Sequence, residues 1–375
     1  MKILLIESFF TGSHRQWAES FQKYSRHEVE ILSLKGRHWK WRMFGGAVSL
    51  ANDFLKNNFQ PDLILATDML DLSTFLGLTR ARTQNIPVGL YFHENQITYP
   101  WAGDSGGADA EWNRQYGFIN YTSALAADEV FFNSDYHRQS FLEGLASFLK
   151  GFPDRKELQN VEAISQKSQV LYLGLDLKAL DGGYEKKDNQ IPVLLWNHRW
   201  EYDKNPDLFF ETLFRFKEEA IAFKLIVLGK SYGKVPSVFK QAQSQLEEEI
   251  IYFGYAKNRQ EYAELLHTAD ILPVTSQQDF FGGSIVEAIY CECFPLLPDR
   301  LAYPEHIPKT FKDRHIYPGD QDFYEALKKI ILEKPYLNSG DTFKNFVTQY
   351  DWSTLAANYD DALEKAVDKR EHKTA

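Results

Sequence analysis

The stretch Ile191-Pro-Val-Leu-Leu-Trp-Asn-His-Arg199 decides the fold, because it restarts a pattern that already runs through the first half of the chain. Apolar runs rich in β-formers alternate with helical stretches, and they are continuous, as expected of parallel strands buried on both faces. In the first half these runs lie at 2–8, 29–34, 62–68, 88–94, 129–135 and 169–176. In the second half they lie at 191–199, 223–230, 250–256, 270–276 and 294–299. The pattern predicts two doubly wound, Rossmann-like α/β domains.

A polar segment separates the two rounds of this pattern. Asp181-Gly-Gly-Tyr-Glu-Lys-Lys-Asp-Asn-Gln190 combines turn formers with charges and has almost nothing to bury, so we place the domain linker there. We expect the domains at 1–180 and 190–350, followed by a helix and tail at 351–375. Ser353 is the expected N-cap of that helix, and the tail from Asp368 is expected to fray. The apolar stripe of the helix consists of Leu355, Tyr359, Leu363 and Val367.

Composition indicates a globular, cytoplasmic protein. Of the 375 residues, 44% are hydrophobic and 15% aromatic, which is enough for two domains that fold without disulfides or metals. Cys291 and Cys293 are too close in sequence to pair without strain and too few for a zinc site, so we expect buried thiols in a reducing compartment. Glu7 interrupts the only apolar run near the N-terminus, which argues against a signal peptide or membrane partner. The net charge of −10 argues against general nucleic-acid coating but allows a local basic patch.

The most informative candidate site is Asp279-Phe-Phe-Gly-Gly-Ser-Ile-Val-Glu287, which follows a predicted strand and leads into a predicted helix. The backbone N–H groups of residues 282–284 would then lie at a helix N-terminus, where free donors and the helix dipole hold a diphosphate. Asp279 and Glu287 would bracket that site and accept hydrogen bonds from sugar hydroxyls. An ordinary helix cap with packing glycines is the alternative interpretation.

A second candidate segment, Trp196-Asn-His-Arg-Trp-Glu-Tyr-Asp-Lys-Asn-Pro-Asp207, follows the first strand of the second domain. It places Arg199 and Lys204 five residues apart. A departing nucleoside diphosphate develops negative charge, which two fixed cations in a dry cleft stabilise without a metal. A solvated charge cluster explains the pair equally well by itself, but the neighbouring phosphate-type segment favours the functional interpretation.

The first domain carries two further candidate segments after predicted strands. Ser8-Phe-Phe-Thr-Gly-Ser-His-Arg15 has a single glycine and so lacks the dinucleotide-binding fingerprint. We expect Gly12, Ser13 and His14 to close over a donor phosphate or an acceptor hydroxyl, with an ordinary strand-to-helix turn as the alternative.

The other segment, His93-Glu-Asn-Gln-Ile-Thr-Tyr-Pro-Trp101, has a density of polar and aromatic groups that packing does not explain. A sugar site needs flat apolar faces flanked by hydrogen-bonding groups, so His93 is the candidate for contacting the transferred sugar and the acceptor. Helix capping by Ser134 or Asp135 is sufficient to explain a third segment, residues 133–138.

A local basic segment, Lys35-Gly-Arg-His-Trp-Lys-Trp-Arg42, carries four cations, a histidine and two tryptophans within eight residues. Interleaved rings and cations suit a flexible nucleic-acid strand. A solvated loop whose tryptophans pack inward is an equally consistent interpretation. The candidate nucleic-acid contacts are Lys35, Arg37, Trp39, Lys40, Trp41 and Arg42.

Taken together, these features resemble the retaining glycosyltransferases of the GT-B fold, in which two sheets face a central cleft and a C-terminal helix packs back toward the N-terminal domain. The features are the two Rossmann-like domains, the Arg199/Lys204 pair, the acidic-x7-Glu segment and the C-terminal helix. More narrowly, four runs look like the tRNA-queuosine α-mannosyltransferase family. They are Ser8-Phe-Phe-Thr-Gly-Ser-His14, Tyr91-Phe-His-Glu-Asn-Gln-Ile-Thr-Tyr-Pro-Trp101, Trp196-Asn-His-Arg-Trp-Glu-Tyr-Asp-Lys204 and Asp279-Phe-Phe-Gly-Gly-Ser-Ile-Val-Glu287.

The resemblance implies mannose transfer from GDP-mannose to the cyclopentenediol of queuosine, at anticodon position 34 of tRNA-Asp, with no metal or other cofactor. It implies that Glu287 binds the ribose hydroxyls and that Asp279 binds the mannose hydroxyls. The broader group usually carries Glu at the Asp279 position, so the shorter carboxylate shifts its oxygens by about one C–C bond. The remaining implied donor contacts are Gly12, Ser13, His14, Arg199, Lys204, Gly282, Gly283, Ser284 and Ile285, and the acceptor contacts are Glu94 and Asn95.

Retention implies that the acceptor hydroxyl attacks from the face that the diphosphate leaves, through an oxocarbenium-like state without a protein nucleophile. The departing phosphate would take the proton of the acceptor, while His93 positions the sugar. Other readings stay open: a GT-B enzyme acting on a lipid or saccharide, a nucleotide-sugar epimerase, and a catalytically silent RNA-binding protein of the same fold.

Overall fold

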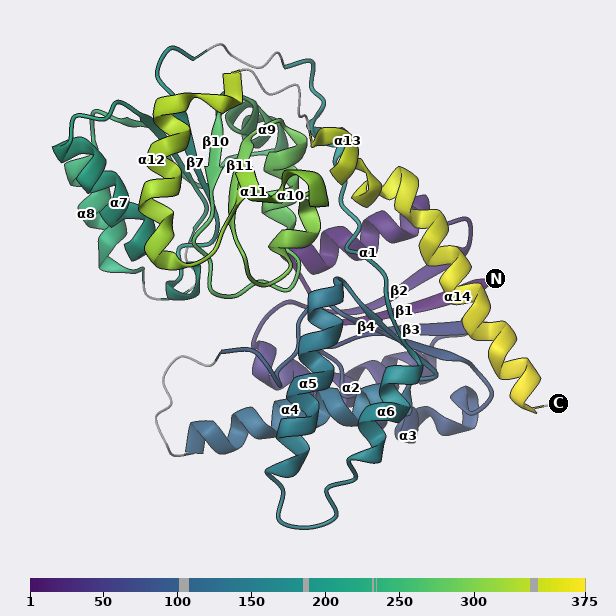
Figure 1. The fold of residues 1–375 in the computed structure, drawn as a ribbon. Coiled ribbons are helices and arrows are strands. Elements are labelled where there is room, and N and C mark those ends of the chain that lie inside the picture. Colours follow the sequence, from purple (N-terminus) through teal and green to yellow (C-terminus); the bar gives the residue numbers. More distant parts are fainter. Residues whose placement is uncertain (101–107, 185–188, 231–232, 234, 338–342, 375) are drawn as a thin grey trace. The chain divides into compact units, whose positions relative to one another are not determined.

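The computed structural model describes residues 1–100, 108–184, 189–230, 233, 235–337 and 343–374. The chain divides into two compact units, one formed by residues 1–174 with 352–375 and the other by residues 175–351 (Figure 1). Each unit is built on its own six-stranded parallel sheet. The expected linker lies within the second unit, and its residues 185–188 are outside the described part of the chain.

The first unit has the strand order β2-β1-β3-β4-β5-β6, with β1 in the interior. Its strands are β1 (Lys2–Phe10), β2 (Glu28–Lys35), β3 (Leu63–Thr67), β4 (Val88–Phe92), β5 (Glu129–Phe132) and β6 (Ser168–Val170). The described pairings are all parallel, with Ile3 opposite both Val29 and Leu63. Because the carboxyl ends of parallel strands meet at one edge of a sheet, side chains that follow β1, β3 and β4 are brought together.

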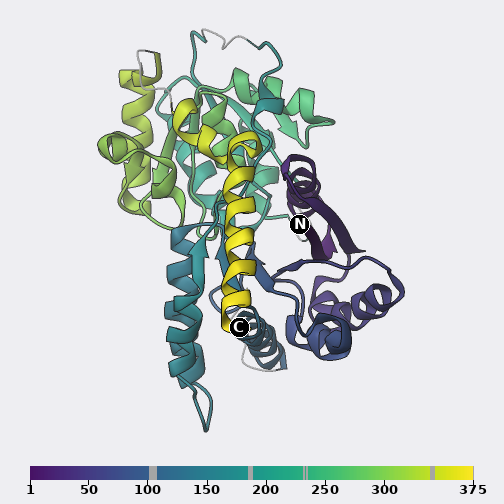
Figure 2. The same ribbon diagram turned by 90° about the vertical axis from the view of Figure 1, so that its right-hand side faces the viewer.

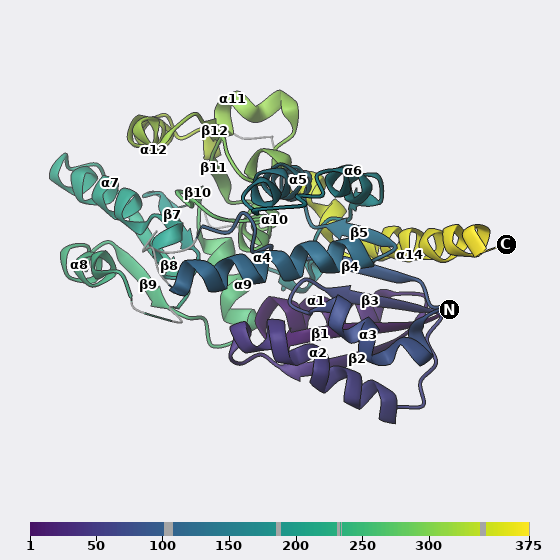
Figure 3. The same cartoon turned by 90° about the horizontal axis from the view of Figure 1, so that it is seen from below.

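Helices cover both faces of this first sheet. They are α1 (Gly12–Tyr24), α2 (Trp39–Lys56), α3 (Leu72–Thr83), α4 (Ala108–Ala126), α5 (Asp135–Lys150), α6 (Gln159–Gln166) and α14 (Trp352–Thr374). Apolar side chains of α2 to α6 pack on one face, where α2 and α3 lie side by side (Figure 3). Apolar side chains of α1 and α14 pack on the other face.

The C-terminal helix α14 is a structural part of the first unit. Leu355, Tyr359 and Leu363 are buried against that unit, which confirms the expected apolar stripe. The hydroxyl of Tyr359 donates to the carbonyl of Tyr172 at 2.8 Å. Figure 2 shows α14 in yellow as one continuous helix.

The expected N-cap of the C-terminal helix was wrong. The helix begins at Trp352, so Ser353 lies in its first turn instead of capping it. The helix continues through the tail that was expected to fray, as far as Thr374, and two ion pairs link the start of that tail to the rest of the first unit. Lys369 pairs with Glu129 at 2.6 Å, and Arg370 pairs with Asp128 at 2.5 Å.

The second unit has the strand order β12-β11-β10-β7-β8-β9. Its strands are β7 (Val193–Asn197), β8 (Lys224–Leu228), β9 (Ile250–Gly254), β10 (Ile271–Pro273), β11 (Phe294–Pro298) and β12 (Ile316–Tyr317). The two parallel sheets confirm the predicted α/β architecture. The edge strand β12 was not predicted, because two residues are too short to produce a periodic signal.

The second sheet is also covered by helices. On one face α7 (Pro206–Glu218), α8 (Ser237–Gln245) and α12 (Phe323–Glu333) bury their aromatic and aliphatic side chains (Figure 1). The helix α10 (Gly283–Tyr290) contacts β7 and β10, and α9 (Arg259–Thr268) precedes β10. The shorter helices are α11 (Lys312–His315) and α13 (Lys344–Val347). Cys291 and Cys293 are buried free thiols, as expected.

Across the described residues, no helix combines the length and the apolar character that a membrane crossing requires.

Candidate active site

In the second unit, the end of β7 is joined to the start of α10 by hydrogen bonds. Asn197, the last residue of β7, donates from Nδ2 to the carbonyl of Ser284 and to the hydroxyl of Tyr262, each at 2.8 Å. Ser284 donates back from its hydroxyl to the carbonyl of Asn197 at 2.8 Å. This reciprocal pair fixes the N-terminal turn of α10 against the sheet.

Glu287 lies on α10 and belongs to the same network. Its Oε2 accepts a 2.8 Å hydrogen bond from Tyr262, and its Oε1 is 2.8 Å from the guanidinium of Arg259. Burial and the charge of Glu287 raise the pKa of Tyr262 well above its ordinary value. Burial alone would lower the pKa of Arg259, but the charge and hydrogen bond of Glu287 raise it. Glu287 is therefore a carboxylate held in one orientation by two donors from α9.

Lys204 is a buried cation between two carboxylates. It ends the short 3-10 turn Tyr202–Lys204 and is 5% exposed. Its Nζ is 3.2 Å from Asp203 and 3.6 Å from Asp279, and it donates to the carbonyl of Gln278. The ammonium therefore ties the loop that carries Asp279 to the turn that follows β7.

Arg199 has a different environment from Lys204. Its side chain is 49% exposed and is 3.4 Å from Glu201. Its charge is nevertheless felt at Asp279: burial would raise the pKa of Asp279, but Lys204, His198 and Arg199 hold it below its ordinary value. Lys204 and Asp279 are thus in contact, and together with Arg199, which acts on Asp279 through its charge, they form one charged cluster. The side chain of Asn197, two residues before Arg199, connects this part of the chain to the network around Glu287.

His198 is affected by the charges of this cluster, and it was not among the residues singled out from the sequence. Burial and the charges of Lys204 and Arg199 lower the pKa of His198 to about 3, although the charge of Asp279 acts in the opposite direction. Its Nε2 is buried and has no hydrogen-bond partner within the part of the chain that the structure describes. A neutral imidazole with an unused nitrogen is suited to contact a ligand hydroxyl.

The start of α10 needs a glycine. Gly282 precedes the helix with a φ of +88°, and a Cβ there would lie 3.1 Å from the ring of Tyr303. Gly283 and Ser284 follow as the first residues of the helix and are partly exposed, as an N-terminal anion site requires. Ile285 differs, because its side chain is fully buried and its N–H donates to the carbonyl of Gly282.

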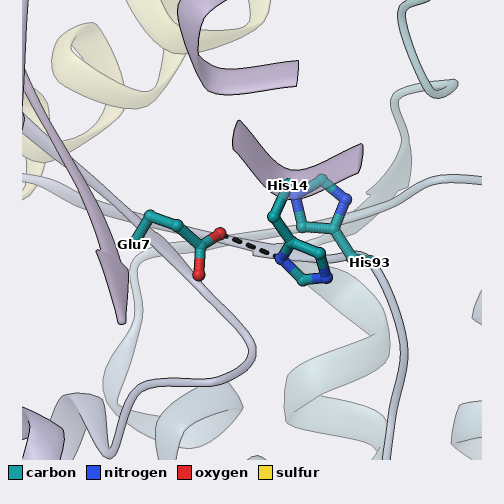
Figure 4. A group of neighbouring side chains, drawn as sticks. All are labelled: Glu7, His14 and His93. Atoms are coloured by element: carbon teal, nitrogen blue, oxygen red, sulfur yellow. Dashed lines mark hydrogen bonds and ion pairs between the residues drawn. The ribbon is translucent and has the colours of Figure 1, made fainter. Parts of the chain in front are cut away.

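In the first unit, Glu7 of β1, His14 of the first turn of α1 and His93 directly after β4 lie together (Figure 4). Nδ1 of His14 is 3.1 Å from Oε2 of the fully buried Glu7, whose Oε1 accepts the N–H of Phe9 at 2.8 Å. Each side chain offers one ligand atom within 4.8 Å of the others, a spacing that would also admit a cation. Sequence reasoning used Glu7 only as an interruption of an apolar run, although an acid inside a buried strand is itself a signal.

His93 is held by its backbone and by aromatic neighbours. Its N–H donates to Oδ1 of Asp68 at 2.8 Å, and its carbonyl accepts from Asn133 at 2.9 Å. The ring packs against Trp17, Tyr91 and His14, with centroids 4.6, 4.8 and 4.4 Å away. Its Nε2 is buried without a hydrogen-bond partner among the described residues. Asp68 was also missed by sequence reasoning, and burial raises its pKa well above the ordinary value.

The other candidates of the first unit have mixed environments. Gly12, with a φ of +52°, and Ser13 are exposed at the start of α1. Glu94 is partly buried and accepts from Gln96 at 2.8 Å. Asn95 is fully buried, and its Oδ1 accepts the N–H groups of residues 97 and 98, so its side chain holds a turn. Trp101 lies outside the described residues. Ser134 caps α5 by accepting from the N–H of His137, which confirms that expectation.

The basic segment spans the end of β2 and the first turn of α2. Trp39 packs against Tyr116 with ring centroids 5.3 Å apart, whereas Trp41 is 64% exposed. One tryptophan therefore packs inward, as the solvated-loop interpretation expects, and the other is exposed. The exposed cations of the segment are Lys35, Arg37 and Lys40, and Arg42 is partly buried. Lys40 and Arg42 lie in the first turn of α2, where cations oppose the helix dipole.

Comparison with solved structures gives the fold class. The catalytic domain of starch synthase IV from Arabidopsis thaliana, bound to ADP and acarbose, covers 98% of this chain with 99% of its own, at 12% identity and a TM-score of 0.72. Sucrose-phosphate synthase from Thermosynechococcus elongatus matches with a TM-score of 0.69 at 14% identity, covering 97% of this chain and 98% of its own. Residues 184–349 match the family described as glycosyl transferases group 1. The chain is a glycosyltransferase with the GT-B fold.

Sequence comparison then gives the family. Residues 2–175 match the family described as tRNA-queuosine alpha-mannosyltransferase N-terminal. The tRNA-queuosine alpha-mannosyltransferase of Drosophila melanogaster is 36% identical over 318 residues, which cover 82% of each chain. The chain belongs to the tRNA-queuosine alpha-mannosyltransferase family, as its four sequence runs indicated.

Proposed function

We propose that this protein transfers mannose from GDP-mannose to the cyclopentenediol of queuosine, at anticodon position 34 of tRNA-Asp, with retention of the anomeric configuration. The observation that carries the proposal is the hydrogen-bonded connection of β7 and α10 through Asn197 and Ser284. Through this connection the N-terminus of α10, the fixed carboxylate of Glu287 and the charged cluster lie close to the end of β7. The chain that carries them belongs to a mannosyltransferase family. The identities of the transferred sugar and of the acceptor nucleoside are inferred from the relatives. We expect the reaction to take place in the cytoplasm, where the protein would meet its tRNA.

The second unit would hold the donor. Glu287, oriented by Tyr262 and Arg259, would accept the two ribose hydroxyls, since an ionised carboxylate offers two adjacent acceptor oxygens. The backbone donors of residues 282–284 would receive the diphosphate at the start of α10. Asp279 would accept from mannose hydroxyls, with Tyr303 3.4 Å from its Oδ2.

Charge stabilisation would be supplied by the protein itself. When the bond between mannose and the diphosphate breaks, negative charge grows on the leaving phosphate. The fixed ammonium of Lys204 and the α10 N-terminus would stabilise that charge, and the more exposed Arg199 would add to it. The leaving phosphate would then accept the proton of the attacking hydroxyl. We propose that neither a metal nor an organic cofactor takes part.

The first unit would hold the acceptor. His93 would contact the transferred sugar or the attacking hydroxyl through its buried Nε2, and Glu94 would contact the diol. The exposed Trp41 and the cations beside it would contact the tRNA backbone and an unstacked base. Gly12 and Ser13 would approach the donor.

The test is to incubate the purified protein with GDP-mannose and queuosine-containing tRNA-Asp, digest the tRNA, and measure the nucleosides by mass spectrometry. We expect a hexose on the queuosine nucleoside that an α-mannosidase removes, and no loss of activity with a chelator. The control is tRNA-Asp with guanine at position 34, which should remain unmodified. Hexose transfer from UDP-glucose alone would reject the donor assignment, and an unmodified queuosine nucleoside with every donor would reject the acceptor assignment.

A further inference from the structure

We propose that Glu7 and His14 form a positioning pair for His93: the Glu7 carboxylate holds a positively charged His14 against the His93 ring, which keeps His93 neutral with Nε2 ready for a ligand hydroxyl. The inference deepens the proposed function and rests on it, because it takes His93 to contact the sugar or the acceptor. Glu7 and His14 are positioning residues in this account, acting through His93.

The surroundings of Glu7 provide one group that can balance its negative charge, the imidazole of His14. Its side chain is fully buried in β1, one oxygen accepts the backbone N–H of Phe9, and the other faces Nδ1 of His14 at 3.1 Å. A buried carboxylate without a cation is costly, and it is stabilised when the imidazole beside it takes up a proton. His14 is placed for this because it lies in the first turn of α1, with its ring beside the carboxylate of Glu7 (Figure 4).

The charged groups around His14 agree with a cation at that position. Glu7 faces it from β1, Asp68 from the end of β3, and Glu94 and His93 from the segment after β4. On its own helix the adjacent Arg15 is exposed and pairs with Glu19 at 2.8 Å. Burial alone would lower the pKa of His14. The charge and hydrogen bond of Glu7 outweigh this effect, and with the charges of Asp68 and Glu94 they raise the pKa of His14 to about 9.

His93 has the opposite balance. Burial lowers its pKa well below the ordinary value, and the charges of His14 and His137 lower it further. Two protonated imidazoles with centroids 4.4 Å apart would repel each other strongly in this partly buried place. The single proton therefore stays on the histidine that has a carboxylate partner. His93 keeps one ring nitrogen as an acceptor and the other as a donor, as a group that contacts a reacting hydroxyl requires.

A cation bound by all three side chains is the competing interpretation, because their ligand atoms lie within 4.8 Å of one another. We favour the hydrogen-bonded pair, since Nδ1 of His14 and Oε2 of Glu7 already lie at hydrogen-bond distance and Oε1 of Glu7 is taken by the backbone. Ligation through these atoms would break that contact.

The first experiment is the pH dependence of kcat/KM for mannose transfer by Glu7→Gln, Glu7→Asp and wild type. In the wild type, loss of the His14 proton should weaken the contact of the His14 ring with Glu7 and so the positioning of His93, which itself stays neutral, and a basic limb should appear near pH 9. Glu7→Gln removes the charge that holds this proton, so the limb should move to lower pH by about one unit or more. Glu7→Asp keeps the charge and should restore the limb while lowering kcat. A purely structural Glu7 would lower activity at all pH values without moving the limb, and that result would overturn the proposal.

The matched control for these variants is Glu19→Gln, on the exposed face of α1. It removes a carboxylate that pairs with a neighbouring cation in the same unit but does not face His14. Its pH profile should coincide with that of the wild type. A basic limb that shifts equally in Glu19→Gln would overturn the proposal, because the shift would then report only the net charge of the unit.

The second experiment reads the proton directly and requires no activity. In the protein labelled with ¹⁵N-histidine and free of substrates, NMR at pH 7.5 should show a doubly protonated His14 and a neutral His93, and a neutral His14 in Glu7→Gln. A neutral His14 in the wild type would overturn the pair even if mannose transfer is observed. If no transfer is observed but His14 is charged, the proposed function fails and the pair stands. Stoichiometric broadening of both rings by Zn²⁺ alone would overturn the pair in favour of a cation site.

Discussion

Lys204 and Arg199 carry the same charge in different environments, and this difference decides what each can do. Lys204 is 5% exposed and is fixed between Asp203 and Asp279, whereas nearly half of the Arg199 side chain is exposed. A charge that is already oriented in a place of low dielectric needs no reorganisation when a phosphate becomes more negative. We therefore expect most of the leaving-group stabilisation to come from Lys204.

Lys204→Ala should lower kcat by about 100- to 1,000-fold and change the Kd for GDP-mannose much less, because the interaction strengthens as the diphosphate leaves. Single-turnover kinetics and calorimetric titration measure the two quantities. Removing a buried cation also leaves Asp203 and Asp279 uncompensated, so Lys204→Gln, which keeps a donor for the carbonyl of Gln278, separates charge from folding. Lys257→Ala, at an 83% exposed side chain, is the control and should behave as wild type. Equal losses in kcat and affinity would contradict this assignment.

At the residue scale, the sequence identifies side chains whose type and position after a strand suggest chemistry, such as His93 and Lys204. It does not identify their partners. Tyr262 and Arg259 orient Glu287 from α9, about 25 positions earlier in the chain, and nothing in their own surroundings marks them. Such partners are set by packing between elements, which one sequence alone does not reveal. Glu7 is the exception, because an acid within a buried parallel strand already requires an explanation.

At the scale of elements, α10 depends on the backbone that precedes it. Gly282 turns the chain into the helix with a φ of +88°, a conformation that costs L-residues energy, and a side chain there would press on Tyr303. The same turn directs the first N–H groups of the helix at their ligand. Strain at this position should therefore affect stability and donor binding together.

Gly282→Ala should destabilise the protein by about 1–3 kcal/mol and weaken GDP binding by roughly tenfold, the equivalent of ~1.4 kcal/mol. Urea unfolding and isothermal titration calorimetry measure these effects. The control is Gly77→Ala in α3, where an added Cβ meets no heavy atom within 4 Å. It should stabilise the protein by roughly 0.5–1 kcal/mol and leave GDP binding unchanged. If Gly282→Ala bound GDP as tightly as wild type, the start of α10 would not be the diphosphate site.

Most of the elements could be predicted from the sequence because their signals are local. Continuous apolar runs mark the buried strands, and the stripe of Leu355, Tyr359 and Leu363 marks α14. The basic segment shows the limit, because its composition cannot separate a loop from a helix start. In the structure Trp39 opens α2 and packs on Tyr116 of α4, a contact between distant parts of the chain.

At the scale of the whole molecule, the chain forms two cores and then returns to the first one. The first unit is completed by α14, whose Tyr359 receives a hydrogen bond from Trp17, lies 2.9 Å from the hydroxyl of Tyr91, and is fully buried. Sequence polarity placed the linker at 181–190, whereas the division by contacts falls at 174/175 and again at 351/352. A polar segment in the sequence indicates that few of its residues are buried. It does not indicate to which unit the residues beside it belong, because that depends on contacts with residues far away in the sequence.

This division predicts that the two units respond separately to perturbation. Tyr359→Ala should lower the free energy of unfolding of the first unit by about 3–5 kcal/mol, as expected for truncating a fully buried aromatic side chain. Saturating GDP, at about 100 times its Kd, should stabilise the second unit by roughly 2.7 kcal/mol. Hydrogen exchange with mass spectrometry in dilute urea locates each effect: peptides from 2–174 should exchange faster in Tyr359→Ala, and peptides from 193–298 slower with GDP. Tyr359→Phe keeps the ring and should cost only about 1 kcal/mol. If either perturbation changed exchange equally throughout residues 1–174 and 175–351, the chain would unfold as one cooperative body, and donor binding could not be assigned to the second unit by this measurement.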